Sequence, residues 1–285
     1  MKLTDVFETL EMEQVAGGYR FIEGPLWHPD GYLLFSDIPA NIIYRYVPGQ
    51  VPTVWRTPSG HSNGLTFDRQ GRLVACEHGN RRVSRTAGFG ADHDGTVEAL
   101  ATCYEGKRLN SPNDVVVRSD GRIFFTDPPY GIEPDQAELG FNGVYRLDVN
   151  GTLHMLADDF DRPNGLAFSP DEHTLYVADT HRYHLRAFDV DASGNLSGDR
   201  IFASMASPME GGPDGIKVDV EGNIYSTGPG AVWVYQPDGT CVGAVVGPQR
   251  PANLAFGDAD RRSLYITART GLYRLRTRIP GPPVF

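Results

Sequence analysis

The amino-acid sequence contains no long apolar run and no excess of positive charge. No window of eighteen or more apolar residues occurs among its 285 residues, so we expect no transmembrane helix. The formal net charge is −10, and an acidic chain lacks the basic surface that binding to nucleic-acid phosphates requires. These two absences predict a protein that binds neither membranes nor nucleic acids.

Cysteine is also scarce, and no secretory signal is recognisable. Cys76, Cys103 and Cys241 lie far apart, with no Cys-x-x-Cys spacing. Such a sparse, odd set is typical of buried thiols in a reducing compartment. The first eight residues, from Met1 to Glu8, lack the apolar core of a signal peptide. Both observations lead us to expect a cytoplasmic protein.

Glycine and proline, by contrast, are abundant. The 33 glycines and 21 prolines indicate frequent turns and leave little room for long helices. Short apolar runs separated by turn residues follow one another along the chain. After Glu23, for example, the pair Asp30-Gly31 lies between two such runs, which is a strong signal for a β-hairpin. We therefore expect an all-β protein built from short strands.

One unit is repeated six times along the chain. Each copy contains a short polar residue, here called its anchor, directly before an apolar strand pattern. The anchors are Glu23, Asn63, Asn113, Asn164, Asp214 and Asn253. Subtracting their positions gives steps of 40, 50, 51, 50 and 39 residues. Repeats of about 40 to 50 residues with four strands each are typical of β-propeller blades. The sequence therefore predicts one domain, residues 1–285, folded as a six-bladed β-propeller with four antiparallel strands per blade.

The last copy has room for only three strands. After Asn253 the chain offers two apolar runs, 264–266 and 272–275, and then reaches Pro280-Gly281-Pro282-Pro283. The segment from about 6 to 15 precedes the first copy and belongs to no blade. We expect this N-terminal segment to form the outer strand of the last blade and to close the ring. Removing the first fifteen residues should then prevent folding.

The longer steps between anchors contain insertions. Residues 86–110 and 128–142 are the least strand-like parts of the chain. Long loops on a rigid scaffold are usually functional or disordered. Because both insertions flank Asn113, we expect them to wall or cover one mouth of the ring.

The anchors should meet at one place. The innermost strand of each propeller blade lines the central channel, so a residue just before that strand lies at one mouth and points to the axis. Two anchors are acids and four are amides. A set of oxygen donors without sulfur or imidazole suits Ca²⁺, Mg²⁺ or Mn²⁺ better than zinc or copper. The carboxylates of Glu23 and Asp214 match a divalent charge, and without a cation they would raise each other's pKa.

A simpler interpretation exists for any single anchor, because Asn and Asp are good turn residues. Glutamate is a poor turn residue, and Glu23 nevertheless occupies the equivalent position in the first copy. The common register of six copies therefore favours a bound metal.

Four of these motifs resemble those of a known family. The chain resembles the SMP-30/gluconolactonase (regucalcin-like) family over essentially its whole length and in the right order. The motifs are Glu23-Gly24-Pro25, Ser111-Pro112-Asn113-Asp114, Arg162-Pro163-Asn164-Gly165-Leu166-Ala167 and Gly212-Pro213-Asp214-Gly215. The resemblance implies a six-bladed propeller that holds a divalent metal, similar to squid-type phosphotriesterases. The Lys-Arg-Leu-Asn-Ser-Pro-Asn-Asp stretch before and around Asn113 is most similar to bacterial gluconolactonases.

The resemblance also implies roles for individual residues. It implies metal ligation by Glu23, Asn164 and Asp214, with Asn113 as a fourth ligand or a substrate contact. It further implies that Asp214 acts as base or nucleophile.

Arg108 is the candidate for the substrate-binding arginine of this family. In regucalcin-type members that arginine lies two residues before the asparagine, where this chain has Ser111. Arg108 is therefore either a substrate contact or a loop residue that points to solvent.

We expect metal-dependent hydrolysis of a sugar lactone such as gluconolactone. The metal would stabilise the developing oxyanion as a Lewis acid, while Asp214 accepts a proton from the attacking water. Ca²⁺ is the expected ion, with Mg²⁺, Mn²⁺ and Zn²⁺ as alternatives. A hydroxyl-rich substrate ring needs polar partners, and the candidates are Asn63, Asn113, Arg108, His61 and Asp127.

Two other functions stay open at this point. The same scaffold could hydrolyse another ester or a phosphotriester, because the long loops decide the substrate. Alternatively, the propeller could bind a ligand or a partner protein around a structural ion without catalysis. The sequence does not predict an oligomeric state.

Two further patterns are interpreted as coincidences. Gly60-His61-Ser62-Asn63-Gly64 matches the Gly-x-Ser-x-Gly pattern of serine hydrolases, but that motif requires a helix directly after it. Residues 65–68 have a strand pattern instead. His181 and His184 have a spacing known from metal sites, yet residues three apart in a strand face opposite sides.

Overall fold

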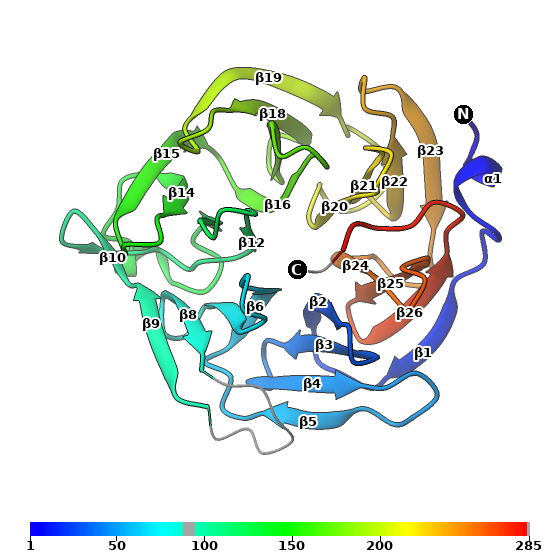
Figure 1. The fold of residues 1–285 in the computed structure, drawn as a ribbon, viewed down its shortest axis with the longest axis horizontal. Coiled ribbons are helices and arrows are strands. Elements are labelled where there is room, and N and C mark those ends of the chain that lie inside the picture. Colours follow the sequence, from blue (N-terminus) through cyan, green and yellow to red (C-terminus); the bar gives the residue numbers. More distant parts are fainter. Residues whose placement is uncertain (88–94, 284–285) are drawn as a thin grey trace.

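The structure is a computed structural model, and it describes residues 1–87 and 95–283. Six four-stranded antiparallel sheets follow one another in a ring around a central axis (Figure 1). Within the described residues, helix is limited to α1 (Leu3–Val6) and one 3-10 turn (Pro134–Gln136). The predicted six-bladed β-propeller is therefore confirmed.

The first three blades run in chain order from the axis outward. Blade 1 consists of β2 (Ile22–His28), β3 (Tyr32–Asp37), β4 (Ile42–Tyr46) and β5 (Thr53–Arg56). Blade 2 consists of β6 (Ser62–Phe67), β7 (Leu73–Glu77), β8 (Arg82–Thr86) and β9 (Val97–Ala101). A small hairpin of β10 (Cys103–Tyr104) and β11 (Lys107–Arg108) precedes blade 3. Blade 3 consists of β12 (Val115–Val117), β13 (Ile123–Asp127), β14 (Asn142–Leu147) and β15 (Leu153–Phe160).

The remaining blades follow the same plan until the last one. Blade 4 consists of β16 (Pro163–Phe168), β17 (Thr174–Asp179), β18 (His184–Val190) and β19 (Leu196–Ser204). Blade 5 consists of β20 (Ile216–Val218), β21 (Ile224–Thr227), β22 (Ala231–Tyr235) and β23 (Cys241–Val246). Blade 6 consists of β24 (Asn253–Gly257), β25 (Ser263–Ala268), β26 (Gly271–Arg276) and the N-terminal β1 (Glu13–Gly17).

The N-terminal segment closes the ring, as the sequence predicted. Strand β1 pairs antiparallel with β26, so the two ends of the chain share one sheet (Figure 1). The strand begins at Glu13 rather than near Val6. Val6 instead ends helix α1, where it and Phe7 are buried against the core between blades 5 and 6. The segment therefore adds both a strand and an apolar plug to the closure.

The apolar core lies between neighbouring blades. One cluster, for example, joins Tyr225 of blade 5 to Leu254 and Leu264 of blade 6. Burying each such side chain stabilises the fold by about 1.5–3 kcal/mol. The faces of adjacent sheets are therefore held in fixed register, which also fixes where their inner strands begin.

Glycine follows the anchor in four of the six copies, namely at Gly24, Gly64, Gly165 and Gly215. A Cβ atom on Gly165 would come within 2.2 Å of the Asp214 carbonyl oxygen. The same atom on Gly215 would come within 2.2 Å of Asn253 Oδ1. Only glycine allows the anchor of the next blade to approach so closely, so these residues bring the anchors together at the axis.

The predicted insertions lie only partly in the described residues. Of the segment 86–110, residues 88–94 fall outside them, and the remainder carries β9 and the β10–β11 hairpin. The segment 128–142 packs over the anchor region. Its Gly131 N–H donates to Ser111 Oγ at 3.0 Å, and a Cβ on Gly131 would lie 2.7 Å from His78 Cβ. This insertion is therefore a wall beside Asn113, as expected.

The cysteine prediction was partly wrong. Cys76 is buried, but Cys103 and Cys241 are exposed. Cys103 lies in the small hairpin, and Cys241 lies in β23, the outermost strand of its blade, where side chains face water. No helix in the described part of the chain has the length and apolarity needed to cross a membrane.

Candidate functional site

Three anchor amides form a hydrogen-bonded arc across blades 2, 3 and 4. Asn63 Nδ2 donates to Asn113 Oδ1 at 2.5 Å, and Asn113 Nδ2 donates to Asn164 Oδ1 at 2.6 Å. The arc continues from Asn164 Nδ2 to Thr180 Oγ1 at 3.0 Å, and Thr180 Oγ1 donates to the Pro213 carbonyl at 2.7 Å. The three amide side chains are buried. The sequence prediction that these anchors converge therefore holds for this arc.

Two acidic anchors, Glu23 and Asp214, complete the ring on the other side. Burial raises the pKa of Glu23 to about 7, although its Oε2 accepts a hydrogen bond from the Gly24 N–H at 2.6 Å. Burial also raises the pKa of Asp214 well above its usual range, and the charge of Glu23 raises it further. A bound cation would favour the ionised forms of these two carboxylates and so relieve the cost of their desolvation.

Asp114 is a third acid that sequence reasoning missed. It occupies the position at which four other copies have glycine. Its Oδ1 accepts the Val115 N–H at 2.9 Å, whereas its buried Oδ2 has no hydrogen-bond partner among the described residues. Burial raises its pKa. An aspartate in place of a repeated glycine was the sequence signal that could have found it.

Lys217 and Asn253 lie on this acidic side of the ring. The Lys217 ammonium lowers the pKa of both Glu23 and Asp114. The Asn253 side chain also lowers the pKa of both acids, so this anchor belongs to the acids rather than to the arc of amides. With Asp214 included, three ionised carboxylates and one ammonium leave two negative charges, which a divalent cation would balance.

His78 is a second residue that sequence reasoning missed. Its Nε2 lies 3.2 Å from Asn113 Oδ1 and 3.3 Å from Asn63 Nδ2. The side chain is buried, and burial lowers the pKa of His78 to about 4, so the imidazole is neutral at neutral pH. His78 directly follows strand β7, and Thr180 directly follows the equivalent strand β17. This shared position was the available signal.

Tyr130 brings the 128–142 insertion to the site. Its hydroxyl interacts with the side chains of Thr180 and Asn164 and with the charge of Asp214. Desolvation raises the pKa of Tyr130 to about 12, although the residue as a whole is 42% exposed. Tyr130 is thus a protonated donor next to the acidic anchors.

Asp127 does not have the predicted role of a substrate contact. Its two carboxylate oxygens accept the N–H groups of Asn110 and Ser111, both at 2.7 Å, and the side chain is fully buried. Asp37 and Asp179 accept pairs of backbone N–H groups in the same way in blades 1 and 4. An aspartate at this position therefore has a structural role in three blades, where it holds the backbone segment that precedes the anchor.

Arg108 lies away from the anchors. Its side chain is exposed in strand β11, where Nη2 donates to the Asn80 carbonyl at 3.4 Å and the backbone N–H donates to Glu138 Oε2 at 2.9 Å. Of the two interpretations left open by the sequence, these contacts favour the exposed loop residue.

His61 lies beside the arc but is not part of it. Its Nδ1 contacts the Ile38 carbonyl at 2.8 Å, and its carbonyl accepts the His78 N–H at 3.1 Å. The neighbouring Ser62 is fully buried in strand β6, with its Oγ 2.9 Å from Ser36 Oγ. A strand rather than a helix follows the serine, so the Gly-x-Ser-x-Gly pattern is a coincidence, as expected.

The donor set fits a hard divalent cation only if amides take part. Among residues 1–87 and 95–283, no group of three His, Cys, Asp or Glu side chains is arranged to hold a metal ion. Glu23 and Asp214 supply charge, Asn164 supplies a neutral oxygen, and Asp114 Oδ2 accepts no hydrogen bond from the part of the chain that the structure describes. Carboxylate and amide oxygens without sulfur are ligands typical of Ca²⁺ and Mg²⁺.

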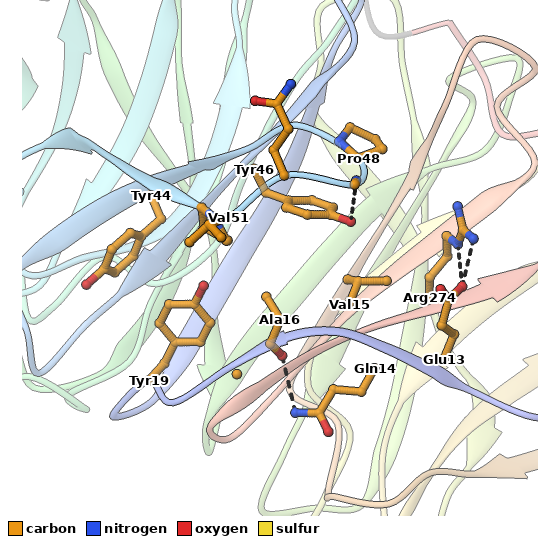
Figure 2. Close-up of a pocket in the computed structure, with 14 residues that line it drawn as sticks. Glu13, Gln14, Val15, Ala16, Tyr19, Tyr44, Tyr46, Pro48, Val51 and Arg274 are labelled. Carbon is orange, nitrogen blue, oxygen red and sulfur yellow. Dashed lines mark hydrogen bonds and ion pairs between the residues drawn. The ribbon is translucent and has the colours of Figure 1, made fainter.

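Two pockets in the described residues lie elsewhere. Figure 2 shows one of about 760 Å³ at the outer rim, between β1 and the β4–β5 turn, lined by Tyr19, Tyr44 and Tyr46. Another, of about 260 Å³, lies at the opposite ends of the inner strands, where Pro282 and Pro283 meet Phe168 and Phe256. No anchor lines either pocket, but Lys217, on the acidic side of the ring, also lines the second one.

Comparisons with known proteins agree with this architecture. The family model described as "SMP-30/Gluconolactonase/LRE-like region" matches residues 21–270. A gluconolactonase from Zymomonas mobilis is 33% identical over 297 residues, covering 95% of this chain and 82% of the relative. The structure of a gluconolactonase from Xanthomonas campestris is 37% identical, with a TM-score of 0.84, and covers 93% of this chain and 89% of its own.

A calcium-binding protein, the regucalcin from Agrobacterium tumefaciens, has a similar structure. Its TM-score is 0.78 at 21% identity, and the match covers 98% of this chain and 95% of that protein. At this identity the likeness shows the fold alone.

Proposed function

Because the chain belongs to the SMP-30/gluconolactonase/LRE-like family and is a lactone hydrolase, we propose that it opens a sugar lactone to the aldonic acid with the help of a divalent cation. The observation that carries the cation dependence is the pair of acids with raised pKa values, the buried Glu23 and the half-buried Asp214, at the end of an arc of amides. The relatives named gluconolactonase support the choice of substrate class.

Glu23, Asn164 and Asp214 would hold the cation, with Asn113 as a fourth ligand or a substrate contact. When bound, the cation supplies Lewis-acid stabilisation of the negative charge that develops on the lactone carbonyl oxygen. We propose Ca²⁺ because all the donors are oxygens and because a protein of the same fold is described as calcium-binding.

Asp214 is the proposed base for the attacking water. Burial raises its carboxyl pKa in the metal-free protein, whereas a bound cation would lower this pKa and keep Asp214 ionised as a proton acceptor. Hydrogen bonding from Asn164 and the charge of Arg250 oppose this rise. These two residues would keep Asp214 ionised and oriented between proton transfers.

The substrate hydroxyls would bind to the polar groups around the anchors. Asn63, Asn113 and His61 remain proposed contacts, and Tyr130 joins them as a hydrogen-bond donor. The phenol of Tyr130 stays protonated because its pKa is raised to about 12. A donor on the insertion next to Asp214 would orient the lactone relative to the base.

Hydrolysis of gluconolactone by purified protein, before and after removal of divalent cations, tests the proposal. We expect ring opening that is lost on chelation and restored by added Ca²⁺. Equal rates with and without the cation would contradict the metal dependence. Hydrolysis of a phosphotriester but of no aldonolactone would contradict the substrate class.

A further inference from the structure

We propose that His78 is a positioning residue that decides which edge of the Asn113 amide faces the cation site. The inference rests on the proposed cation dependence. It comes from the direction of the hydrogen bonds in the arc of amides and from the contacts of the His78 ring.

The hydrogen bonds of the arc run in one donor-to-acceptor direction, which the Pro213 carbonyl at its end determines. The Pro213 carbonyl can only accept, so the Thr180 hydroxyl must donate to it. The Thr180 oxygen is then the acceptor for Asn164 Nδ2, which turns Asn164 Oδ1 toward Asn113. Asn113 therefore presents its NH₂ edge to Asn164 Oδ1 at 2.6 Å.

This orientation turns the Asn113 oxygen away from the acids. Asn113 Oδ1 faces Asn63 Nδ2 at 2.5 Å and His78 Nε2 at 3.2 Å. An amide NH₂ group has no lone pair to offer a cation, so Asn113 cannot be a ligand in this arrangement. For Asn113 to become the fourth ligand, its amide must turn over and present Oδ1 on the side of Asn164.

His78 is able to stabilise both orientations. A neutral imidazole carries one N–H and one bare nitrogen. With the proton on Nε2, His78 donates to Asn113 Oδ1 across the separation of 3.2 Å. With the proton on Nδ1, the bare Nε2 accepts a hydrogen bond from Asn113 Nδ2, which leaves Oδ1 for the cation. The neighbouring Asn63 is an amide and is able to turn with it.

The packing around His78 leaves little room for another group to take the place of its ring beside Asn113. The side chain is only 7% exposed, its backbone N–H is held by the His61 carbonyl at 3.1 Å, and the insertion packs at Gly131 against its Cβ. Water therefore has little access to replace the ring. A buried amide that turns over without a matching partner would leave an unsatisfied polar group.

Nitrogen chemical shifts of the histidine ring test the proposal directly. Protein with ¹⁵N-labelled histidine is compared before and after Ca²⁺ is added to the chelated form, and the His78 signals are assigned with the His78→Gln variant. We expect the proton on Nε2 without Ca²⁺ and on Nδ1 with Ca²⁺. A proton that stays on Nε2 while calorimetry shows Ca²⁺ binding would overturn the proposal.

Variants give a second readout. His78→Leu should weaken Ca²⁺ affinity by about 10–100-fold, the usual effect of removing a group that orients a ligand. His78→Gln, which retains a donor and an acceptor, should restore most of this affinity. His28→Leu is the matched control, because His28 is equally buried at 8% but lies at the far end of β2. It should lower Tm and leave Ca²⁺ affinity unchanged.

The outcomes separate the two proposals. Wild-type protein that binds Ca²⁺ no better than His78→Leu, with neither binding measurably, overturns the proposed cation dependence and this inference together. Wild type and His78→Leu that bind Ca²⁺ equally well overturn the role of His78 alone.

Discussion

The six anchors fall into two halves that differ in charge and in hydrogen bonding. On one side, Asn63, Asn113 and Asn164 are neutral and satisfy one another through hydrogen bonds of 2.5 and 2.6 Å. On the other side, Glu23 is buried and Asp214 is half-buried. Burial raises the pKa of both acids, and the charge of Glu23 raises that of Asp214 further. The amide half is complete in the protein alone, whereas the acidic half is complete only with a cation or with bound protons.

The amide half therefore preorganises the site, whereas the acidic half would provide the affinity for the cation. The amide half holds its oxygens in place through contacts that end at the Pro213 carbonyl. The acidic half stores the unfavourable energy of buried charge, which a divalent cation would convert into affinity. Substitutions in the two halves should therefore have different signatures with and without Ca²⁺.

The largest effect is expected when the proposed base is neutralised. Asp214→Asn keeps the shape of the side chain but removes both the charge and the proton acceptor. We expect kcat/KM for gluconolactone to fall by about 10³-fold, within the range of general-base catalysis, as measured by titration of the acid released. Ser62→Ala, at the discarded serine motif, should retain most activity. The reverse pattern in the two variants would invalidate the role of Asp214.

Removing the other acid should change stability in a pH-dependent way. Glu23 has a pKa of about 7 in the folded, metal-free protein and about 4.3 when unfolded. Its folded form therefore binds a proton more tightly, and the wild type loses stability as pH rises from about 4.5 to 7. Metal-free Glu23→Gln should be more stable than wild type at pH 8 by about 3 kcal/mol.

The comparison of Glu23→Gln with wild type cancels the contribution of the titrating groups that do not interact with Glu23, whereas the pKa of Asp214, which the Glu23 charge raises, changes with the substitution. The stability difference should shrink as the pH falls toward 5, because the wild-type carboxyl is then protonated. With saturating Ca²⁺ the order should reverse, and the wild type should melt at the higher temperature. Thermal unfolding that shows the same difference at pH 5 and pH 8 would contradict this assignment.

Moving an acid into the amide half tests the comparison from the other side. Asn164→Asp removes the donor to Thr180 and adds a fourth carboxylate to the group of Glu23, Asp114 and Asp214. We expect the metal-free variant to lose about 1–3 kcal/mol of stability and to regain more than wild type when Ca²⁺ is added. Asn150→Asp, in an exposed turn, is the control and should change neither quantity. A variant whose Ca²⁺-dependent gain in Tm equals that of wild type would argue against a cation near Asn164.

The smallest effect is expected at the insertion. Tyr130→Phe removes one hydroxyl donor, which is worth about 0.5–1.5 kcal/mol and corresponds to a loss of about 2- to 10-fold in kcat/KM. Ca²⁺ affinity should not change, because the phenol is not among the proposed ligands. Tyr183→Phe, on an exposed turn of blade 4, is the control. A large loss of Ca²⁺ affinity in Tyr130→Phe would assign this residue to the cation site instead.

The repeated pattern made the fold and the position of the anchors predictable. Each blade has the same polar anchor followed by an apolar strand pattern. One copy is a weak signal for a blade, but six copies in the same register together indicate a propeller. The closing strand was also predictable, because blade 6 lacked a fourth strand within its own segment. Its start at Glu13 was missed because Val6 and Phe7 pack as an apolar plug, and apolar residues alone do not distinguish a strand from such a plug.

The parts of the site that were missed lie outside the repeat or replace one of its members. Asp114 occupies the position at which four other copies have glycine. His78 directly follows strand β7, and the residues at the same position in other blades mostly have structural roles. Tyr130 belongs to an insertion whose path the sequence does not specify. Asp127 accepts two backbone N–H groups. It was misassigned because the residue type alone does not distinguish such a buried aspartate from one that contacts a substrate.

Calorimetric titration of Ca²⁺ into the chelated protein tests the central claim most directly. We expect one saturable site per chain in the wild type and a strongly weakened site in Asp214→Asn, which lacks one of the two acidic anchors. Absence of saturable binding in the wild type, or equal binding by the two proteins, would contradict the claim that the buried acids of the ring hold a divalent cation.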